Sequence, residues 1–207
     1  MSLKTALLVG TITFFQNAVG IVTRPYETSR RIAGNPKITE LPMLVGILIA
    51  YFAVASLVKT AAFRPYLLTK QFVVLCSGAG FLYLVTVVAL WKAATIIGSK
   101  GGLLNIAVAW AYTLIPTIVW FFVTSLLFVI LPPPRTSSIQ GIVFSILYLV
   151  FSITLLFWKI ILAYLAIRFS MKLDLLRILG ASVIALPVVV AACILLYRFG
   201  IFRVPFI

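Results

Sequence analysis

Five long apolar stretches occupy most of this 207-residue chain and define the solvent in which it folds. A bilayer core about 30 Å thick needs roughly 20 helical residues to cross it. Each stretch comes close to that length and carries at most one charge in its interior. The predicted spans are Leu41 to Val58, Phe72 to Ile97, Leu103 to Leu131, Ile142 to Ile167, and Ile178 to Tyr197. The sequence therefore predicts an all-α, polytopic membrane helical bundle with five transmembrane helices.

The composition supports one compact membrane unit. Hydrophobic residues make up 64% of the chain and the mean hydropathy is +1.24, whereas a soluble domain is about 45–50% apolar. We expect an N-terminal region at 1–40, a five-span membrane domain at 41–200 and a tail at 201–207. Residues Met1 to Val22 are less apolar than the spans, which predicts an amphipathic helix at the membrane interface, with a sixth span as the alternative.

The prolines and the connectors between spans predict where helices begin, break and continue. A basic connector carries Pro25 and Pro36, and a short helix is expected between them. Pro116 lies near the middle of the third predicted span and should kink or open that helix, because proline lacks an N–H and its ring clashes with the preceding turn. The connector at 168–177 is expected to continue as a helix that leaves the membrane.

The charge balance indicates an anionic partner. The chain has 17 Lys and Arg against three acids, a net charge of +14, and each cation near an anionic membrane surface contributes roughly 1 kcal/mol. No soluble basic face with aromatic platforms is evident, so nucleic acid is not an expected partner. Basic residues favour a cytoplasmic N-terminus in the cell membrane. The candidate headgroup-binding residues are Arg30, Arg31, Lys92, Lys100, Arg168, Lys172 and Arg177.

Polar side chains form a stripe on each of two predicted spans. On the third span, hydroxyl and indole groups recur at helical spacing near Pro116, and on the fourth span four polar residues fall within about 60° of one another. A helix-packing interface is one interpretation of these stripes, and a face that contacts lipid, solute or a partner is the other. The candidate face comprises Tyr112, Thr113, Pro116, Thr117, Ser145, Tyr148, Ser152 and Lys159.

Lys159 is a lysine inside a predicted span, and two positions are open to it. Its side chain can extend to the headgroups beside Trp158, or it can face the bundle. In the second case the partner would be a lipid phosphate or an anionic solute, because the three acids lie in connectors or flanks of the spans.

The inventory of reactive side chains does not favour an enzyme. The chain has no histidine, and its two cysteines, Cys76 and Cys193, lie within predicted spans as small apolar groups. Ser152 and Lys159 are two helical turns apart, about 10 Å, which is too far for direct proton transfer. We expect no catalytic residues, no metal and no cofactor.

Three sequence elements resemble the Yip (Ypt-interacting protein) domain family. Residues 111–116, Ala-Tyr-Thr-Leu-Ile-Pro, resemble the Gly-Tyr-Ser-Leu-Leu-Pro element in the third span of that family. The basic run at 30–36 is similar to the entry of prokaryotic members. Trp158, followed by a helix to Arg168 and the segment 175–180, is similar to the family's link between spans four and five. The resemblance covers roughly residues 24–197.

This resemblance implies a five-span bundle with a cytoplasmic N-terminus, in a minimal member of the prokaryotic type. Eukaryotic members are linked to vesicle traffic and to Rab-type GTPases, as membrane scaffolds without known catalysis. The present sequence lacks their long acidic N-terminal region and its Asp-Leu-Tyr element, so a GTPase partner is not expected.

Two functional hypotheses follow. The first is a non-enzymatic scaffold or accessory subunit of Yip type that binds anionic lipids, other membrane proteins or a second copy of itself. The alternative is a permease or transporter subunit for an anionic or amphipathic solute, built around Pro116 and Lys159.

Overall fold

The computed structural model describes residues 3–59, 65–130 and 139–200. In these residues it contains helices and no strand, so the all-α prediction is confirmed for this part of the chain. The predicted tail at 201–207 and the proline-rich connector at 132–134 lie outside the described residues. The elements are α1 (Leu3–Thr23), α2 (Pro25–Gly34), the short 3-10 helix η1 (Ile38–Glu40), α3 (Leu41–Lys59), α4 (Pro65–Ile96), α5 (Leu103–Tyr112), α6 (Ile115–Ile130), α7 (Ile139–Met171) and α8 (Leu175–Arg198).

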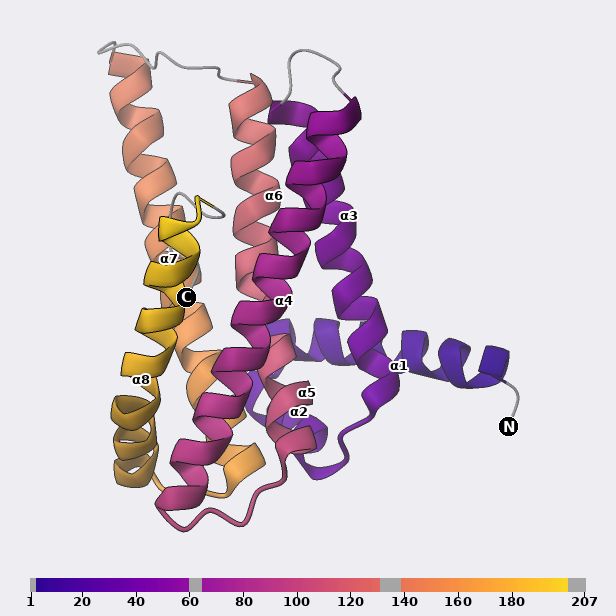
Figure 1. Cartoon of the computed structure of the whole chain (residues 1–207), viewed down its shortest axis with the longest axis vertical. Coiled ribbons are helices and arrows are strands. Elements are labelled where there is room, and N and C mark those ends of the chain that lie inside the picture. The colour runs from indigo at the N-terminus through magenta and orange to yellow at the C-terminus, as the bar shows by residue number, and fades with distance from the viewer. Residues whose placement is uncertain (1–2, 60–64, 131–138, 201–207) are drawn as a thin grey trace.

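The long helices run side by side, and the N-terminal helices are placed differently. Figure 1 shows α3, α4, α6, α7 and α8 extending along the long axis, whereas α1 lies across it. Helix α2 packs on α7, α5 and α1 at the same end of the bundle. Helix α4 packs along α8. The N-terminal region therefore forms a base across one end of the helix bundle.

Four segments are long and apolar enough to cross a membrane. They are Phe72–Ile96, Leu103–Thr124, Gly141–Met171 and Leu175–Arg198, and they correspond to the last four predicted spans. The first predicted span falls in α3, which has 19 residues. The apolar helical segment at this place, Ile38–Ala53, begins in η1 and is shorter than the other four segments. Val9–Thr23 in α1 is also a shorter apolar helix. The count of five spans therefore stays a prediction.

The predicted break at Pro116 is confirmed. Helix α5 ends at Tyr112 and α6 begins at Ile115, with a tight turn between them. Proline has no N–H to donate to the carbonyl of Tyr112, so the regular ladder cannot continue. The turn is closed by the amide of Thr113, which donates to Trp110 O at 3.0 Å, and by the amide of Leu114, which donates to Ala111 O at 3.2 Å. The hydroxyl of Thr113 donates to the same Trp110 carbonyl at 2.7 Å.

The predicted short helix between the prolines is also confirmed as α2. Pro25 occupies its first turn, where a missing N–H costs nothing because no partner exists there. Four side chains on one face are buried, those of Thr28, Ser29, Ile32 and Ala33. Outside this face, the ring of Tyr26 meets the ring of Phe169 edge to face, with centroids 5.0 Å apart.

The prediction of a continuous helix at 168–177 is wrong. Helix α7 ends at Met171, Lys172 adopts a left-handed conformation with φ of 53°, and α8 begins at Leu175. The amide of Leu173 donates back to the carbonyl of Arg168 at 3.3 Å, and the Leu173 side chain is buried. Burying Leu173 in the core requires the chain to turn here, which a continuing helix would prevent.

The turn before α5 packs against this end of α7. The hydroxyl of Ser99 donates to the carbonyl of Met171 at 2.7 Å. A Cβ on Gly101 would meet the Ser170 carbonyl oxygen and would lie 2.7 Å from Met171 Cα. The absence of a side chain at Gly101 therefore allows two backbone segments to touch.

Two main hydrophobic clusters hold the bundle together. One joins α4, α5, α7 and α8 through residues such as Ala94, Ile106 and Ala181. The other joins α1, α2, α5 and α7 and includes Phe14 and Leu162. Many large apolar side chains on α7 and α8 are exposed on the outer surface instead. In a protein of this hydropathy, such surfaces face lipid.

Candidate functional site

A buried polar cluster joins the N-terminal helices to the helix break. The carboxylate of Glu40 is 2% exposed, and its Oε2 accepts a hydrogen bond from the Tyr112 hydroxyl at 2.5 Å. The Asn17 amide donates to the same oxygen at 3.0 Å and to the Tyr112 hydroxyl at 3.4 Å. Arg31 Nη2 donates to Asn17 Oδ1 at 2.7 Å. One residue from each of α1, α2, η1 and α5 thus contributes to the cluster.

This cluster stabilises a carboxylate that would otherwise be costly to bury. A buried acid without hydrogen-bond donors loses several kcal/mol of hydration, and Glu40 has two donors on a single oxygen. Glu40 flanks the first predicted span, and no sequence pattern predicted a role for it. Two signals were present: Asn17 interrupts an apolar helix, and Glu40 immediately precedes an apolar span.

The two predicted polar stripes meet at the α6–α7 contact. Trp120 Nε1 donates to the Ser152 hydroxyl at 3.0 Å, and the hydroxyls of Thr124 and Tyr148 share a hydrogen bond of 3.1 Å. The helices also pack together here. Ser145 is exposed and donates to its own helix, to the carbonyl of Gly141. Ser152 and Tyr148 therefore belong to a helix-packing contact, which we call the α6–α7 seam.

Three of the remaining candidate residues, Thr113, Thr117 and Lys159, line a partly open cavity of about 300 Å³. Its walls come mainly from α3, α4 and the α5–α6 break, and Lys159 of α7 also lines it. Thr113 and Thr117 line the cavity, whereas Tyr112 is held in the buried polar cluster. Pro116 is fully buried at the helix break. The structure thus divides the predicted face into a cluster, a seam and a cavity.

The seven candidate headgroup residues are all exposed and lie at one end of the bundle. They come from α2, the end of α4, the following turn, the end of α7 and the start of α8, which gather at the lower end of Figure 1. Two of these seven cations contact aromatic side chains. Lys92 Nζ lies 4.9 Å from the Trp91 ring centroid, and Arg168 donates to the Tyr164 hydroxyl at 2.8 Å. We call this surface the basic end.

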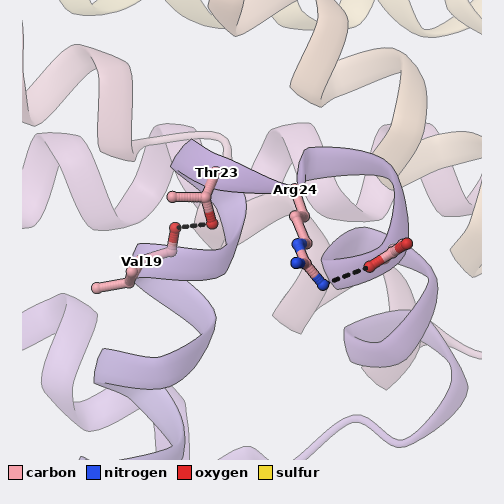
Figure 2. A network of polar contacts seen from close by, with 4 residues as sticks. Val19, Thr23 and Arg24 are labelled. Atoms are coloured by element: carbon pink, nitrogen blue, oxygen red, sulfur yellow. Dashed lines mark hydrogen bonds and ion pairs between the residues drawn. The ribbon is translucent and has the colours of Figure 1, made fainter.

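A groove of about 880 Å³ lies beside the basic end, between α1 and α2. Its wall includes Arg24 and Arg31. Figure 2 shows Arg24 next to Thr23 where α1 ends, with the Thr23 hydroxyl donating to the Val19 carbonyl at 3.0 Å. Arg24 forms an ion pair of 3.8 Å with Glu27, and both side chains are largely exposed. Such a surface pair contributes little to stability.

An all-α bundle with four segments long and apolar enough to cross a membrane, and no strand in its described residues, is typical of a polytopic integral membrane protein. The Yip1 domain profile matches residues 19–197, which is most of the chain. The chain therefore belongs to the Yip1 domain family, as the resemblance predicted. Comparison with curated proteins and with solved structures gives no match.

Two residues of the segment that resembles the family's third-span element have defined structural roles in this chain. In residues 111–116 the tyrosine is Tyr112, which bonds the buried Glu40, and the proline is Pro116, which ends the regular helix. The Yip1 family is a membrane-protein family that is not known as enzymatic.

Proposed function

We propose that this chain is a non-enzymatic scaffold or accessory subunit of the cell membrane, which binds anionic lipids at its basic end and associates with other membrane proteins. The observation that carries the proposal is the gathering of seven exposed cations from separate segments at one end of the bundle. Segments as far apart as α2 and the start of α8 contribute to it. The fold therefore concentrates charge that the sequence distributes over 148 positions, from Arg30 to Arg177.

The charge at the basic end is only weakly compensated. Glu27 and Asp174 are the exposed acids of this region, and Glu27 already pairs with Arg24. Glu40 is buried away from the surface. Each cation beside an anionic leaflet contributes roughly 1 kcal/mol, so seven of them favour an anionic lipid environment strongly over a neutral one.

The same charge favours an orientation. Cationic segments are retained on the cytoplasmic side of a membrane, so the basic end faces the cytoplasm in our proposal. Helix α1 lies across the bundle at this end, the position expected of a helix at the membrane interface. The N-terminus is then cytoplasmic, and α1 does not form a sixth span.

Recovery of the tagged chain in native nanodiscs, with mass spectrometry of proteins and lipids, tests this function. We expect anionic lipids to be enriched over the bulk membrane, together with a stoichiometric membrane-protein partner. The combined variant Arg168→Gln, Lys172→Gln and Arg177→Gln, which removes three of the seven cations, should weaken the lipid enrichment. Arg198→Gln, at the other end of α8, is the matched control. A lipid composition equal to the bulk, with no stoichiometric partner, would contradict the proposal.

A permease role is the second candidate, and one observation favours it. Lys159 lines the partly open cavity together with Thr113 and Thr117 from the helix break, and broken helices near the midplane form the binding sites of many transporters. Replacing Lys159 by Met in proteoliposomes separates the two roles. Loss of uptake of an anionic solute supports the permease, and unchanged permeability leaves the scaffold.

A further inference from the structure

The partly open cavity has an apolar wall that follows the axis of α3. Helix α3 lines it with six side chains, those of Leu41, Leu44, Val45, Leu48, Ile49 and Phe52. From the first to the last of these residues, the helix rises roughly 16 Å at 1.5 Å per residue. Gly80 of α4 also lines the cavity, and no atom lies within 4 Å of the position that its Cβ would take. The cavity is thus elongated and hydrocarbon-like.

Lys159 is the one charged residue on the cavity wall described by the structure. Its ammonium group is a positive charge in a mainly apolar wall, where charge–charge interactions are weakly screened. Thr113 and Thr117 are on the wall as well, where α5 gives way to α6. The polar part of the cavity therefore favours a negative charge.

The volume limits the size of an occupant. Ligand cavities in proteins span roughly 300–1,000 Å³, so a cavity of about 300 Å³ is at the small end. One acyl chain fits this elongated space better than the two chains of a phospholipid.

We propose that this cavity binds one single-chain amphipathic anion, whose carboxylate or phosphate head lies at Lys159 and whose acyl chain lies against α3 and α4. This binding is separate from the lipid surface at the basic end, because Lys159 is not part of that surface. It goes beyond the scaffold role and holds whether or not the chain transports the bound molecule.

Binding of three probes to the full-length chain in neutral-lipid nanodiscs tests the proposal. The probes are dodecanoate, dodecyl phosphate and the uncharged dodecanol, and native mass spectrometry counts the bound molecules. We expect one anion per chain, and affinity for dodecanol weaker by about tenfold or more, a difference of about 1.4 kcal/mol. Whichever anion binds more tightly identifies the head, because a fatty acid carries a carboxylate and a lysophosphatidic acid a phosphate.

Two pairs of variants locate the bound anion. Lys159→Met should lower anion affinity to that of dodecanol, whereas Arg198→Met, which removes an exposed cation outside both the cavity and the basic end, should leave it unchanged. Gly80→Leu should fill the cavity and abolish binding of all three probes. Gly46→Leu, also at an open glycine but on a part of α3 that does not line the cavity, should have no effect.

Equal anion affinity in the wild type and in Lys159→Met would overturn the proposal, as would absence of anion binding by the folded wild type. If Lys159→Met does not fold, Gly80→Leu decides the matter, since unchanged binding in that variant also overturns it. Lipid enrichment at the basic end is measured in the same variants and should not change. The two proposals can therefore fail separately.

Discussion

The hydroxyl of Tyr112 donates a hydrogen bond to the carboxylate of Glu40, and this contact links the end of α5 to the residue that precedes α3. The two residues are 72 positions apart in the chain. Asn17 adds a second donor to the same carboxylate oxygen, so α1 is tied to the same point. The tyrosine of the family's third-span element therefore fixes how the N-terminal helices dock on the membrane bundle.

Replacing Tyr112 by Phe tests this contact. The substitution keeps the ring, which stacks on Phe14 at 6.0 Å, but leaves Glu40 with a single donor. Removing one partner of a buried hydrogen bond costs about 1–3 kcal/mol, so the midpoint of thermal unfolding in detergent should fall. Tyr197→Phe serves as the control, since that side chain is 59% exposed. Equal midpoints for the two variants would contradict the assigned role.

Replacing Asn17 by Leu should release α1. The variant removes the donor to Glu40 and the acceptor for Arg31 together, and the buried carboxylate then relies on Tyr112 alone. We expect faster hydrogen exchange in α1 and α2, with α8 unaffected. The neighbouring Gln16 is exposed, and Gln16→Leu should exchange like the wild type. Slow exchange of α1 in the Asn17 variant would show that packing of Phe14 and Ile21 holds the helix without the cluster.

Gly101→Ala should destabilise the fold through a backbone clash. The new methyl group would meet the Ser170 carbonyl and the Met171 Cα, and neither can move without shifting the end of α7. Overpacking of this kind costs about 1–3 kcal/mol, measurable as a loss of stability to denaturant. Gly34→Ala makes the same change where no atom lies within 4 Å. Its stability should stay at or slightly above that of the wild type, because Ala favours helix over Gly.

A double-mutant cycle measures the α6–α7 seam. Trp120→Phe and Ser152→Ala each remove one side of the 3.0 Å hydrogen bond. Hydrogen bonds between membrane helices contribute about 0.6 kcal/mol on average, and we expect a coupling energy of that size. The pair Trp120→Phe with Thr154→Ala should show none, because Thr154 is exposed and bonds its own helix. Equal coupling in both cycles would rule out a specific seam.

Local sequence features predicted local structure well. Length and hydropathy located α4, α7 and α8, and Pro116 located the break between α5 and α6. Each of these signals acts within a few turns of one helix, so no knowledge of tertiary contacts was needed. The turn at Lys172 was missed because the segment has neither Gly nor Pro. The signal there was Asp174, a residue type that commonly precedes a helix and takes the N-cap position of α8.

The candidate site depended on contacts that the sequence could not supply. Glu40 is buried only because α1 docks across η1 and α5, which brings Asn17 and Tyr112 to it. For Lys159, extension to the headgroups and a position facing the bundle were both open, and the described structure places it on the cavity wall. The polar stripes were visible as periodicity, but which helix each would face was not.

The lipid selectivity of the reconstituted chain tests whether the basic end binds anionic lipids. Spin-labelled anionic and zwitterionic lipids of equal chain length report their relative affinity for the protein surface. We expect a preference for the anionic lipid that weakens as salt rises. The preference should be weaker in the combined variant Arg168→Gln, Lys172→Gln and Arg177→Gln, and unchanged in Arg198→Gln. Equal affinity of the wild type for both lipids, at low salt, would contradict anionic-lipid binding by the basic end.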